Sequence, residues 1–486
     1  MKRNASPSRA ARAAALSALV TFSMLGALEL AGCASLPPPT PARQAKAPTA
    51  YATEAAFSSP VADWPADGWW KRYGDTQLNA LMDEALAGSP TLAQAQARVV
   101  SARSATAVAA AQELPQITGQ GQVQEQKQTY AYLFPKQFLP LGYQDYGQVT
   151  LNLNWELDFW GKNRAAVRAA ASDARAAAAD AAEARLVLTT DIASQYATLA
   201  RLYSDREVAV EAEKVRDETA GLTAQRVANG LDTQAELKQA EAGSPAARAS
   251  VVALDEEIAQ TRDALAALVG AGPDRGLALS PPQAAHLAAF GLPADLRLGL
   301  IGRRPDVIAA RWRAEAASHR IKEAKAAFYP DVNLSGYIGQ QSLHLDQLVT
   351  PGAALGSIGP AVTLPIFEGG RLRGALRGAR ADRDAAVAAY DEAVTEALRE
   401  VADVAASERA LGDRLAESRK ALDFYEGAYK VARLRYEGGL STFQSVLLAE
   451  DAVLAQRQVV SDLESRAFTL DVALVRALGG GFSGAA

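Results

Sequence analysis

The chain has 486 residues, of which 49% are hydrophobic and 22% charged, so it has enough apolar material for a large core and more than one structural region. Its formal net charge of −5 gives no reason to expect nucleic acid or an anionic membrane surface as a partner. The histidines His286, His319 and His344 lie far apart and beside no cysteine, so the sequence predicts no metal site and no cofactor.

The first 32 residues predict an export signal. A basic head precedes a short apolar run, residues 13–28, which falls short of the roughly 20 residues of a membrane-spanning helix. LAGC, residues 30–33, resembles the bacterial lipobox, in which cleavage before the cysteine leaves a lipid-modified N-terminus. Cys33 is the only cysteine, and we predict that it carries the lipid. The proline-rich residues 37–50 are expected to form an unstructured tether.

In the rest of the sequence, segments of the first half match segments of the second half in the same order. Proline and glycine positions are preserved between the matching segments, which chance similarity of alanine-rich helices would not achieve. Residues 89–121 match 304–336, residues 159–163 match 367–371, and residues 226–237 match 435–446. The sequence therefore indicates an internal duplication.

Each half follows one plan in chain order: a helix ended by proline, then two strands, then two long helices. The long helices reach about 80 Å at 1.5 Å per residue, so they are expected to stand in water. The helices are expected at about 78–114, 165–224 and 235–269, and again at about 296–329, 372–434 and 445–478.

The predicted strands alternate strictly. Val149, Leu151 and Leu153 alternate with Thr150 and Asn152, which gives one apolar and one polar face. An ordinary sheet with one wet side is the common interpretation of this pattern. The strand lengths, the uncharged polar face and the long aromatic loop at residues 126–146 favour a membrane barrel instead. Four strands cannot close a barrel, so closure requires other copies of the chain.

Three motifs, LNWELDFWGK (153–162), LPIFEGGR (364–371) and RYEGGLSTFQSVL (435–447), together with this plan resemble the outer membrane factor family of TolC-like efflux channels. The NodT-like lipoprotein branch is the most similar. The resemblance implies a mainly α fold with a membrane β-barrel: a homotrimer forming a 12-stranded barrel continuous with a long periplasmic α-helical barrel. It also implies a lipid-anchored protein of the bacterial outer membrane, working with a periplasmic adaptor and an inner-membrane pump, expected to be of the RND type.

The resemblance also implies a domain organisation. The predicted regions are a signal peptide (1–32), a lipidated tether with an equatorial segment (33–70), a first repeat (71–272), an equatorial linker (273–294), a second repeat (295–478) and a tail (479–486). Within the repeats the strands are expected at about 117–127, 146–157, 331–340 and 357–366.

The resemblance places a periplasmic gate at the two helical turns. Gly230 and Gly439 suit turns that need positive φ. The turn-proximal tyrosine of the family matches Tyr436, and an acid that it contacts in some members matches Glu236. We predict that a hydrogen bond between these two side chains holds the gate shut; an ordinary surface tyrosine and glutamate are the alternative.

The constriction departs from the family pattern. Members with acidic rings carry carboxylates where this chain has Ser445 and Leu448, so an apolar constriction is expected, with Gln444 beside it. Glu450 and Asp451 lie close by in the sequence and could supply charge instead.

A cluster of aromatic and glycine residues is expected to form the joint between barrel and tunnel. Aromatic side chains suit a membrane–water interface, and glycine lets the chain bend out of the sheet. The predicted joint residues are Trp155, Phe159, Trp160 and Gly161, with Pro365, Gly369 and Gly370 in the second repeat.

No enzyme motif is found in the sequence. Residues 270–276 contain a G-x-G pattern, but this pattern follows a helix, so we interpret it as a helix C-cap and turn and not as a phosphate-binding loop. The sequence therefore predicts a passive exit duct for small molecules such as drugs and toxic compounds. A type I protein secretion duct and a lipid-anchored periplasmic coiled-coil scaffold remain the alternatives.

Overall fold

The computed structural model describes residues 36–38, 41–129, 131, 136–138, 140–283, 287 and 290–484. Its contacts define two compact units. One comprises Val100–Arg175, Arg311–Ala388 and the described residues up to Gln44; the other comprises Ala45–Val99, Ala176–Ala310 and the described residues from Ala389 onward. Each unit draws on both predicted repeats. The predicted export signal and the predicted lipidation site Cys33 lie outside the described residues.

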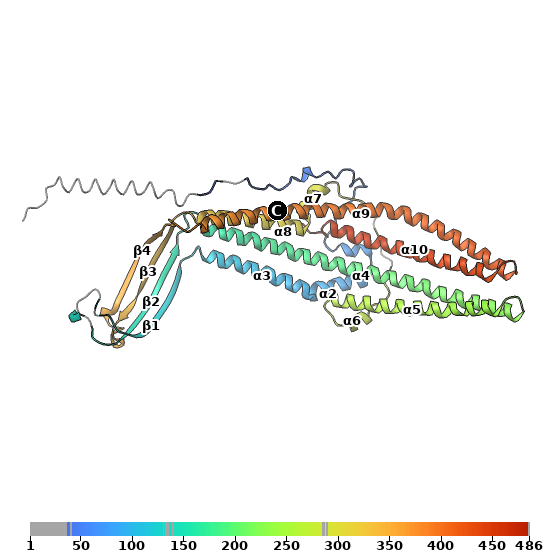
Figure 1. Ribbon diagram of the computed structural model, residues 1–486, viewed down its shortest axis with the longest axis horizontal. Coiled ribbons are helices and arrows are strands. Elements are labelled where there is room, and N and C mark those ends of the chain that lie inside the picture. Colours follow the sequence, from blue (N-terminus) through green and yellow to red (C-terminus); the bar gives the residue numbers. More distant parts are fainter. Residues whose placement is uncertain are drawn as a thin grey trace, which may run out of the picture. The chain divides into compact units, whose positions relative to one another are not determined.

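The two repeats are built from helices of equal length. Helices α3 (Pro90–Ala111) and α8 (Pro305–Ala326) have 22 residues each, α4 (Lys162–Ala228) and α9 (Arg371–Glu437) have 67 each, and α5 (Gln234–Leu268) and α10 (Phe443–Ala477) have 35 each. Figure 1 shows that α4 continues into α5, and α9 into α10, through a short turn. The predicted duplication and the predicted long helices are confirmed.

The first helix of each repeat is broken, where one continuous helix was expected. In the first repeat α2 (Thr76–Gly88) precedes α3, and in the second repeat α7 (Leu296–Arg303) precedes α8. Pro90 and Pro305 follow the breaks, and the residues before them, Ser89 and Arg304, are extended with ψ of 124° and 120°. Proline disfavours the helical conformation in the residue before it, so the helix ends there and restarts at the proline.

Short helices complete the helical part of the described chain. They are η1 (Pro48–Ala50), η2 (Trp69–Tyr73), η3 (Lys136–Phe138), α6 (Asp274–Leu277), η4 (Leu345–Gln347) and η5 (Pro351–Ala353). No helix among the described residues is both long and apolar enough to cross a membrane.

The strands of both repeats join in one antiparallel sheet of order β1-β2-β3-β4. Its strands are β1 (Gln116–Gln126), β2 (Gln144–Glu156), β3 (Asp331–Ser342) and β4 (Ala354–Thr363). The first three lie within two residues of the predicted bounds. The fourth lies three residues earlier than predicted and ends two residues before Pro365.

The sheet has one apolar and one polar face, as predicted. Leu151 lies opposite Gly119 and Ile338, whereas its neighbour Asn152 lies opposite Thr118 and Tyr337. Among the described residues, most of the apolar face is uncovered in the protomer, whereas Thr150 of the polar face is buried. The exposed large side chains of the apolar face are Ile117, Val123, Val149, Leu151, Ile338, Ile358 and Val362. With β1 and β4 at its edges, the sheet has one unpaired side at each end.

The described part of the proline-rich segment, which was predicted to be an unstructured tether, lies against α9. Arg380 donates to the carbonyl oxygens of Pro37 and Pro38, and Asp391 accepts the backbone N–H of Lys46. Apart from the short helix η1, the described residues of this segment form no helix or strand. Several of its backbone polar groups are bonded by side chains of α9.

The second unit has an aromatic core around η2 and α2. Trp69, Trp70 and Tyr73 are buried there, with Leu78, Leu81 and Met82. The Tyr73 ring packs edge-on against Phe468 of α10, with centroids 4.7 Å apart. Burial of such large side chains is the main source of stability in this unit.

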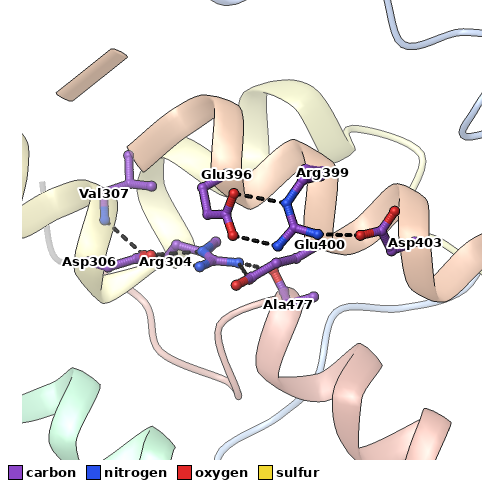
Figure 2. A network of polar contacts seen from close by, with 8 residues as sticks. All are labelled: Arg304, Asp306, Val307, Glu396, Arg399, Glu400, Asp403 and Ala477. Atoms are coloured by element: carbon purple, nitrogen blue, oxygen red, sulfur yellow. Dashed lines mark hydrogen bonds and ion pairs between the residues drawn. The ribbon is translucent and has the colours of Figure 1, made fainter. Parts of the chain in front are cut away.

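Figure 2 shows how the break between α7 and α8 is fixed by Arg304, whose side chain is 7% exposed. Its Nε and Nη2 donate to Asp306 Oδ1 and Oδ2 at 3.0 and 2.6 Å. Its Nη1 donates to Glu400 Oε2 of α9 at 2.5 Å and to the Ala477 carbonyl oxygen, at the end of α10, at 3.2 Å. One guanidinium thus holds α8, α9 and α10 together.

Glu183 on α4 lies near this network, and its pKa is raised to about 7. Burial is the largest cause; the charges of Asp306 and Glu400 add to it, while those of Arg304 and Arg476 oppose it. The ordinary pKa is 4.5, so the folded protein binds this proton more tightly than the unfolded chain does. The contribution of Glu183 to stability is therefore full below about pH 4.5 and is lost as the pH rises toward 7.

The substitution Glu183→Gln removes this titration. We expect the melting temperature of the variant to fall less between about pH 5 and about pH 8 than that of the wild type. Thermal unfolding of the purified protein followed by circular dichroism at both pH values measures the difference. Glu392→Gln, at the exposed counterpart on α9, is the control and should follow the wild type. Equal pH slopes for Glu183→Gln and the wild type would contradict the prediction.

Candidate functional site

The two helical hairpins end in turns of the same geometry. Gly230 and Gly439 have φ of 71° and 70°, as their predicted role requires. The N–H of Leu231 bonds the carbonyl oxygen of Arg226 at 2.9 Å, and that of Leu440 bonds the carbonyl oxygen of Arg435 at 2.7 Å. Glycine adopts this left-handed conformation without the steric cost of a side chain, and the bond closes the helix end.

Tyr436 lies at the end of α9 with its side chain fully buried. It packs in a small apolar cluster with Ala240 of α5 and with Phe443 and Val446 of α10. Its ring and that of Phe443 have centroids 6.1 Å apart. The Tyr436 side chain therefore contacts both hairpins of the protomer and is not an ordinary surface residue.

The Tyr436 hydroxyl and its ring are held by residues of the α4–α5 hairpin. The hydroxyl donates to Asp232 Oδ2 and lies 3.2 Å from Thr223 Oγ1. Arg226 donates from Nε to Asp232 Oδ2 at 2.8 Å and from Nη1 to the Tyr436 carbonyl oxygen at 2.8 Å. The guanidinium carbon of Arg226 also lies 4.4 Å from the centre of the Tyr436 ring. We call Tyr436, Asp232 and Arg226 the turn latch.

The predicted hydrogen bond between Tyr436 and Glu236 does not form in the protomer. Glu236 Oε2 instead accepts from Thr233 N at 2.7 Å and from Thr233 Oγ1 at 3.0 Å, and so caps the start of α5. Asp232, which the sequence analysis missed, is the partner of Tyr436. The sequence does contain a signal for the role of Glu236, because the order Thr-x-x-Glu is a capping box in which the glutamate caps its own helix.

The protonation states of the latch suit hydrogen bonding. Burial and the bond to the Asp232 carboxylate raise the pKa of Tyr436 to about 12. Burial opposes ionisation of Asp232, but the hydrogen bonds from Arg226 and Tyr436 outweigh it and lower the Asp232 pKa. The phenol is therefore protonated and the carboxylate charged at neutral pH, so every bond of the latch is present.

A second set of contacts links the two hairpins at positions further from the turns. Arg216 of α4 bonds the carbonyl oxygen of Gly243 on α5 at 3.4 Å, and pairs with Glu450 and Asp451 of α10 at 3.4 and 3.2 Å. Glu450 is buried, so in the protomer it is a partner of Arg216 and does not supply open charge. The predicted constriction residues Gln444, Ser445 and Leu448 are exposed on α10.

At the predicted joint, two tryptophan side chains donate hydrogen bonds to nearby backbone carbonyl oxygens. Trp155 Nε1 donates to the Glu113 carbonyl oxygen at 3.0 Å, and Trp160 Nε1 donates to the Pro330 carbonyl oxygen at 2.8 Å. The Trp160 ring stacks on Tyr329 with centroids 4.8 Å apart. The exposed Phe159 lies between the two tryptophans in the sequence.

Glycines turn the chain from sheet to helix in both repeats. Gly161 has φ of 77°, and Gly369 and Gly370, which follow Pro365, have φ of 55° and 89°. The Asp158 carboxylate accepts the backbone N–H of Arg164 at 2.9 Å and so caps the beginning of α4. These positions fit the predicted bend, and their placement at a membrane surface stays a proposal.

We predict that Gly161→Ala destabilises the protein by about 1–2 kcal/mol, since an L-residue pays this in the left-handed region. Gly378→Ala on α9 is the matched control. Gly378 is not among the glycines with positive φ, and an added methyl group would meet nothing within 4 Å in the protomer. Thermal unfolding should show a lower melting temperature only for Gly161→Ala. A Gly161→Ala protein as stable as the control would contradict the prediction.

Neither the turn latch nor the joint offers a metal site. Across the described ranges, no group of three or more histidine, cysteine, aspartate or glutamate side chains is arranged to hold a metal ion.

Comparison with known proteins identifies the class. The family model described as outer membrane efflux protein matches residues 81–271 and 299–480, one segment for each repeat. The multidrug resistance outer membrane protein MdtP of Shigella flexneri is 30% identical over 478 residues, which are 97% of this chain and 98% of MdtP. The fusaric acid resistance protein FusA of Burkholderia cepacia is 37% identical over 363 residues, 73% of this chain and 68% of FusA.

Solved structures agree with this class. The outer membrane protein VceC of Vibrio cholerae matches with a TM-score of 0.82 at 44% identity, covering 86% of this chain and all of VceC (100%). The outer-membrane channel OprN matches with a TM-score of 0.79 at 28% identity, covering 92% of this chain and 99% of OprN.

The duplicated helical hairpins and shared sheet are thus those of an outer-membrane efflux channel. The chain belongs to the outer membrane efflux protein family. It is an exit duct of the outer membrane that extends into the periplasm, and it is not an enzyme.

Proposed function

We propose that three copies of the chain close a 12-stranded β-barrel in the outer membrane, continuous with a helical barrel in the periplasm. The observation that carries this is the four-stranded sheet, whose two edges are unpaired and whose apolar face is exposed in the protomer. Unpaired strand edges are not tolerated in lipid, and the smallest single-chain barrels have about eight strands. Pairing β1 of one copy with β4 of the next removes every edge.

The duct conducts small molecules passively. The polar face of the sheet would line its lumen with uncharged side chains of glutamine, asparagine and threonine, such as Gln120, Gln122 and Asn152. The compounds are handed over by a periplasmic adaptor and an inner-membrane pump of the RND type, which supplies the energy. The names of MdtP and FusA support drugs and toxic organic compounds as cargo.

Cys33 anchors each copy to the outer membrane through a covalent lipid. The support is the lipobox-like LAGC at residues 30–33 and the position of Cys33 just before the segment that lies on α9. Two tryptophans at the joint, Trp155 and Trp160, suit the interface where the sheet leaves the membrane.

The helical turns form the periplasmic gate. The latch of Tyr436, Asp232 and Arg226 ties the two hairpins of a protomer together and thereby keeps the tunnel tip narrow. The exposed Gln444 and Leu448 of α10 are the residues that would line the constriction, with Ser445 where acidic members carry charge. Glu236 supports the gate indirectly, because it caps α5 beside the turn.

Drug susceptibility of the native host tests this function. We expect deletion of the gene to lower the inhibitory concentrations of several unrelated toxic compounds by about fourfold or more, and the wild-type gene to restore them. Unchanged susceptibility, together with the loss of a polypeptide from the culture medium, would contradict the proposal and favour a type I secretion duct.

A further inference from the structure

We propose that a basic patch at the beginning of α4 and α9 binds the headgroups of anionic phospholipids in the periplasmic leaflet of the outer membrane. The patch consists of Arg164, Arg168, Arg373 and Arg377. The inference rests on the proposed function, because it requires that the sheet spans the membrane and that both helices leave it on the periplasmic side. The whole chain carries 55 acidic against 50 basic residues, so its net charge hides this local excess of positive charge.

The first turns of α4 and α9 are basic in an unfavourable position. Residues 162–172 and 371–381 carry basic side chains and no acidic one, and the first acids follow at the equivalent positions Asp173 and Asp382. The helix macrodipole favours acids near the beginning of a helix and disfavours cations there. These charges therefore cost stability in the isolated protomer, and an anionic partner would offset that cost.

The duplication separates the patch from ordinary surface charge. Helix α9 is the counterpart of α4 at an offset of 209 residues, since the helices begin at Lys162 and Arg371. Of the ten basic residues of α4, only the three at its beginning and Arg226 of the turn latch have a basic counterpart on α9. The other six, Arg175, Arg185, Arg201, Arg206, Lys214 and Arg216, correspond to Asp384, Val394, Ala410, Leu415, Asp423 and Tyr425. Most of the basic charge has thus diverged between the repeats, whereas the charge at the beginning of the helix is kept.

The first residue of α4 shows on which side of the sheet the patch lies. Lys162 Nζ pairs with Glu156 Oε1 at 2.7 Å and with Asp331 Oδ1 at 3.4 Å. Both carboxylates come from strand positions that alternate with the apolar ones, so Lys162 is directed toward the polar face. At about 100° per residue, Arg164 and Arg168 lie about 200° and 240° around the helix from Lys162. They therefore project toward the side of the apolar face, and the patch residues of α9 have the same spacing from the first residue of that helix.

Exposed aromatic residues mark the level of the patch relative to the membrane. Phe159 and Trp160 precede α4, and Phe367 precedes α9; all three are exposed in the protomer. Aromatic side chains are enriched at the headgroup level, and the headgroup layer is roughly 5–8 Å deep on each side of the bilayer. Arg164 and Arg168 lie about 3 and 9 Å along α4 from its first residue. Helical side chains point back toward the N-terminus, here toward the membrane, so both guanidinium groups can reach the headgroup phosphates.

The guanidinium groups retain donors for a phosphate. Arg164 donates from Nε to Asp158 Oδ2 at 3.3 Å and from Nη2 to the Asp158 carbonyl oxygen at 2.9 Å. Arg377 donates from Nε to the Arg373 carbonyl oxygen at 3.4 Å. Each guanidinium has five N–H donors, so these bonds orient the group and leave other donors for a phosphate oxygen. A phospholipid with net negative charge is favoured over a zwitterionic one, whose own cation would face the patch.

Lipid binding to the full lipoprotein, purified from outer membranes in mild detergent, tests the patch. The probes are phosphatidylglycerol and phosphatidylcholine with the same fluorescent acyl chain, and the readout is fluorescence anisotropy. The patch variant carries Arg168→Gln, Arg373→Gln and Arg377→Gln. Arg164 is retained, because it also bonds Asp158 beside the beginning of α4.

A matched control removes the same charge from the long helices of the tunnel. It carries Lys238→Gln, Lys420→Gln and Lys430→Gln, all at exposed positions of α5 and α9. A second variant, with lysine at the three substituted patch positions, keeps the charge and should bind like the wild type.

We expect the wild type to prefer phosphatidylglycerol, and the patch variant to bind it at least tenfold more weakly, with phosphatidylcholine unaffected. Each basic residue near an anionic lipid surface contributes about fivefold, which supports this magnitude. Equal phosphatidylglycerol affinity in the patch variant and the wild type would overturn the patch, as would an equal loss in the lysine control. Altered ion selectivity of the patch variant with unchanged lipid binding would place these charges in the lumen and overturn it too. Native mass spectrometry of the same samples separates this result from the proposed function, because trimers without lipid preference overturn only the patch, whereas an absence of trimers overturns the duct.

Discussion

Tyr436→Phe and Asp232→Ala are each expected to raise the closed-state conductance of the channel in a planar bilayer by several-fold. The first substitution removes only the hydroxyl that donates to Asp232, while the ring stays in its cluster with Phe443. A hydrogen bond to a charged group contributes about 1.5–3 kcal/mol, and the loss of about 1 kcal/mol of this is enough to shift the balance toward the open tip several-fold. The second substitution also removes the carboxylate that holds Arg226.

Glu236→Gln is the matched control for the gate. Glutamine can take the place of glutamate in a capping box, so the variant should keep the start of α5 and conduct like the wild type. This pattern separates the latch in the structure from the Tyr436–Glu236 bond expected from the sequence. Unchanged conductance in both Tyr436→Phe and Asp232→Ala would contradict the latch.

Arg304→Met is expected to destabilise the folded protein by about 3 kcal/mol. The substitution retains much of the apolar volume but leaves the carboxylates of Asp306 and Glu400 without their cation. Breaking one side of a buried ion pair costs about 3–5 kcal/mol, and the lower end applies because both carboxylates are about one-third exposed. The Ala477 carbonyl oxygen also loses a donor.

The readout for Arg304→Met is the melting temperature of the purified protein, which should fall by several degrees. Arg399→Ala is the control, because its ion pairs with Glu396 and Asp403 are exposed on α9, the helix that carries Glu400, and such pairs contribute little. Figure 2 shows both arginines. Equal melting temperatures for the two variants would contradict the role assigned to Arg304.

Sequence reasoning succeeded where the signal is local or repeated. Strict alternation at Leu151, Asn152 and Leu153 is enough to give a strand and its two faces, because side-chain direction in a strand depends only on position. The matched turns at Gly230 and Gly439 could be predicted because a left-handed backbone conformation favours glycine. The duplication strengthened each of these predictions, since every element was seen twice.

Contacts between distant parts of the chain were not predictable in the same way. Arg304 finds Glu400 and Ala477 at sequence separations of 96 and 173 residues, and no pattern in one sequence announces such a partner. The proline-rich segment was expected to be a tether because its composition excludes regular structure, but composition does not reveal its contacts with α9. Glu236 was predicted to bond Tyr436 because a contact known in the family was transferred to this chain without considering that Glu236 fits the local capping box.

The number of copies in the channel is the most direct test of the account. Native mass spectrometry of the lipoprotein extracted from outer membranes in mild detergent measures it without assumptions about cargo or partners. Closure of the four-stranded sheet predicts a single species containing three chains, each carrying acyl groups at Cys33. A species with one or two chains would leave sheet edges unpaired in lipid and would contradict the account.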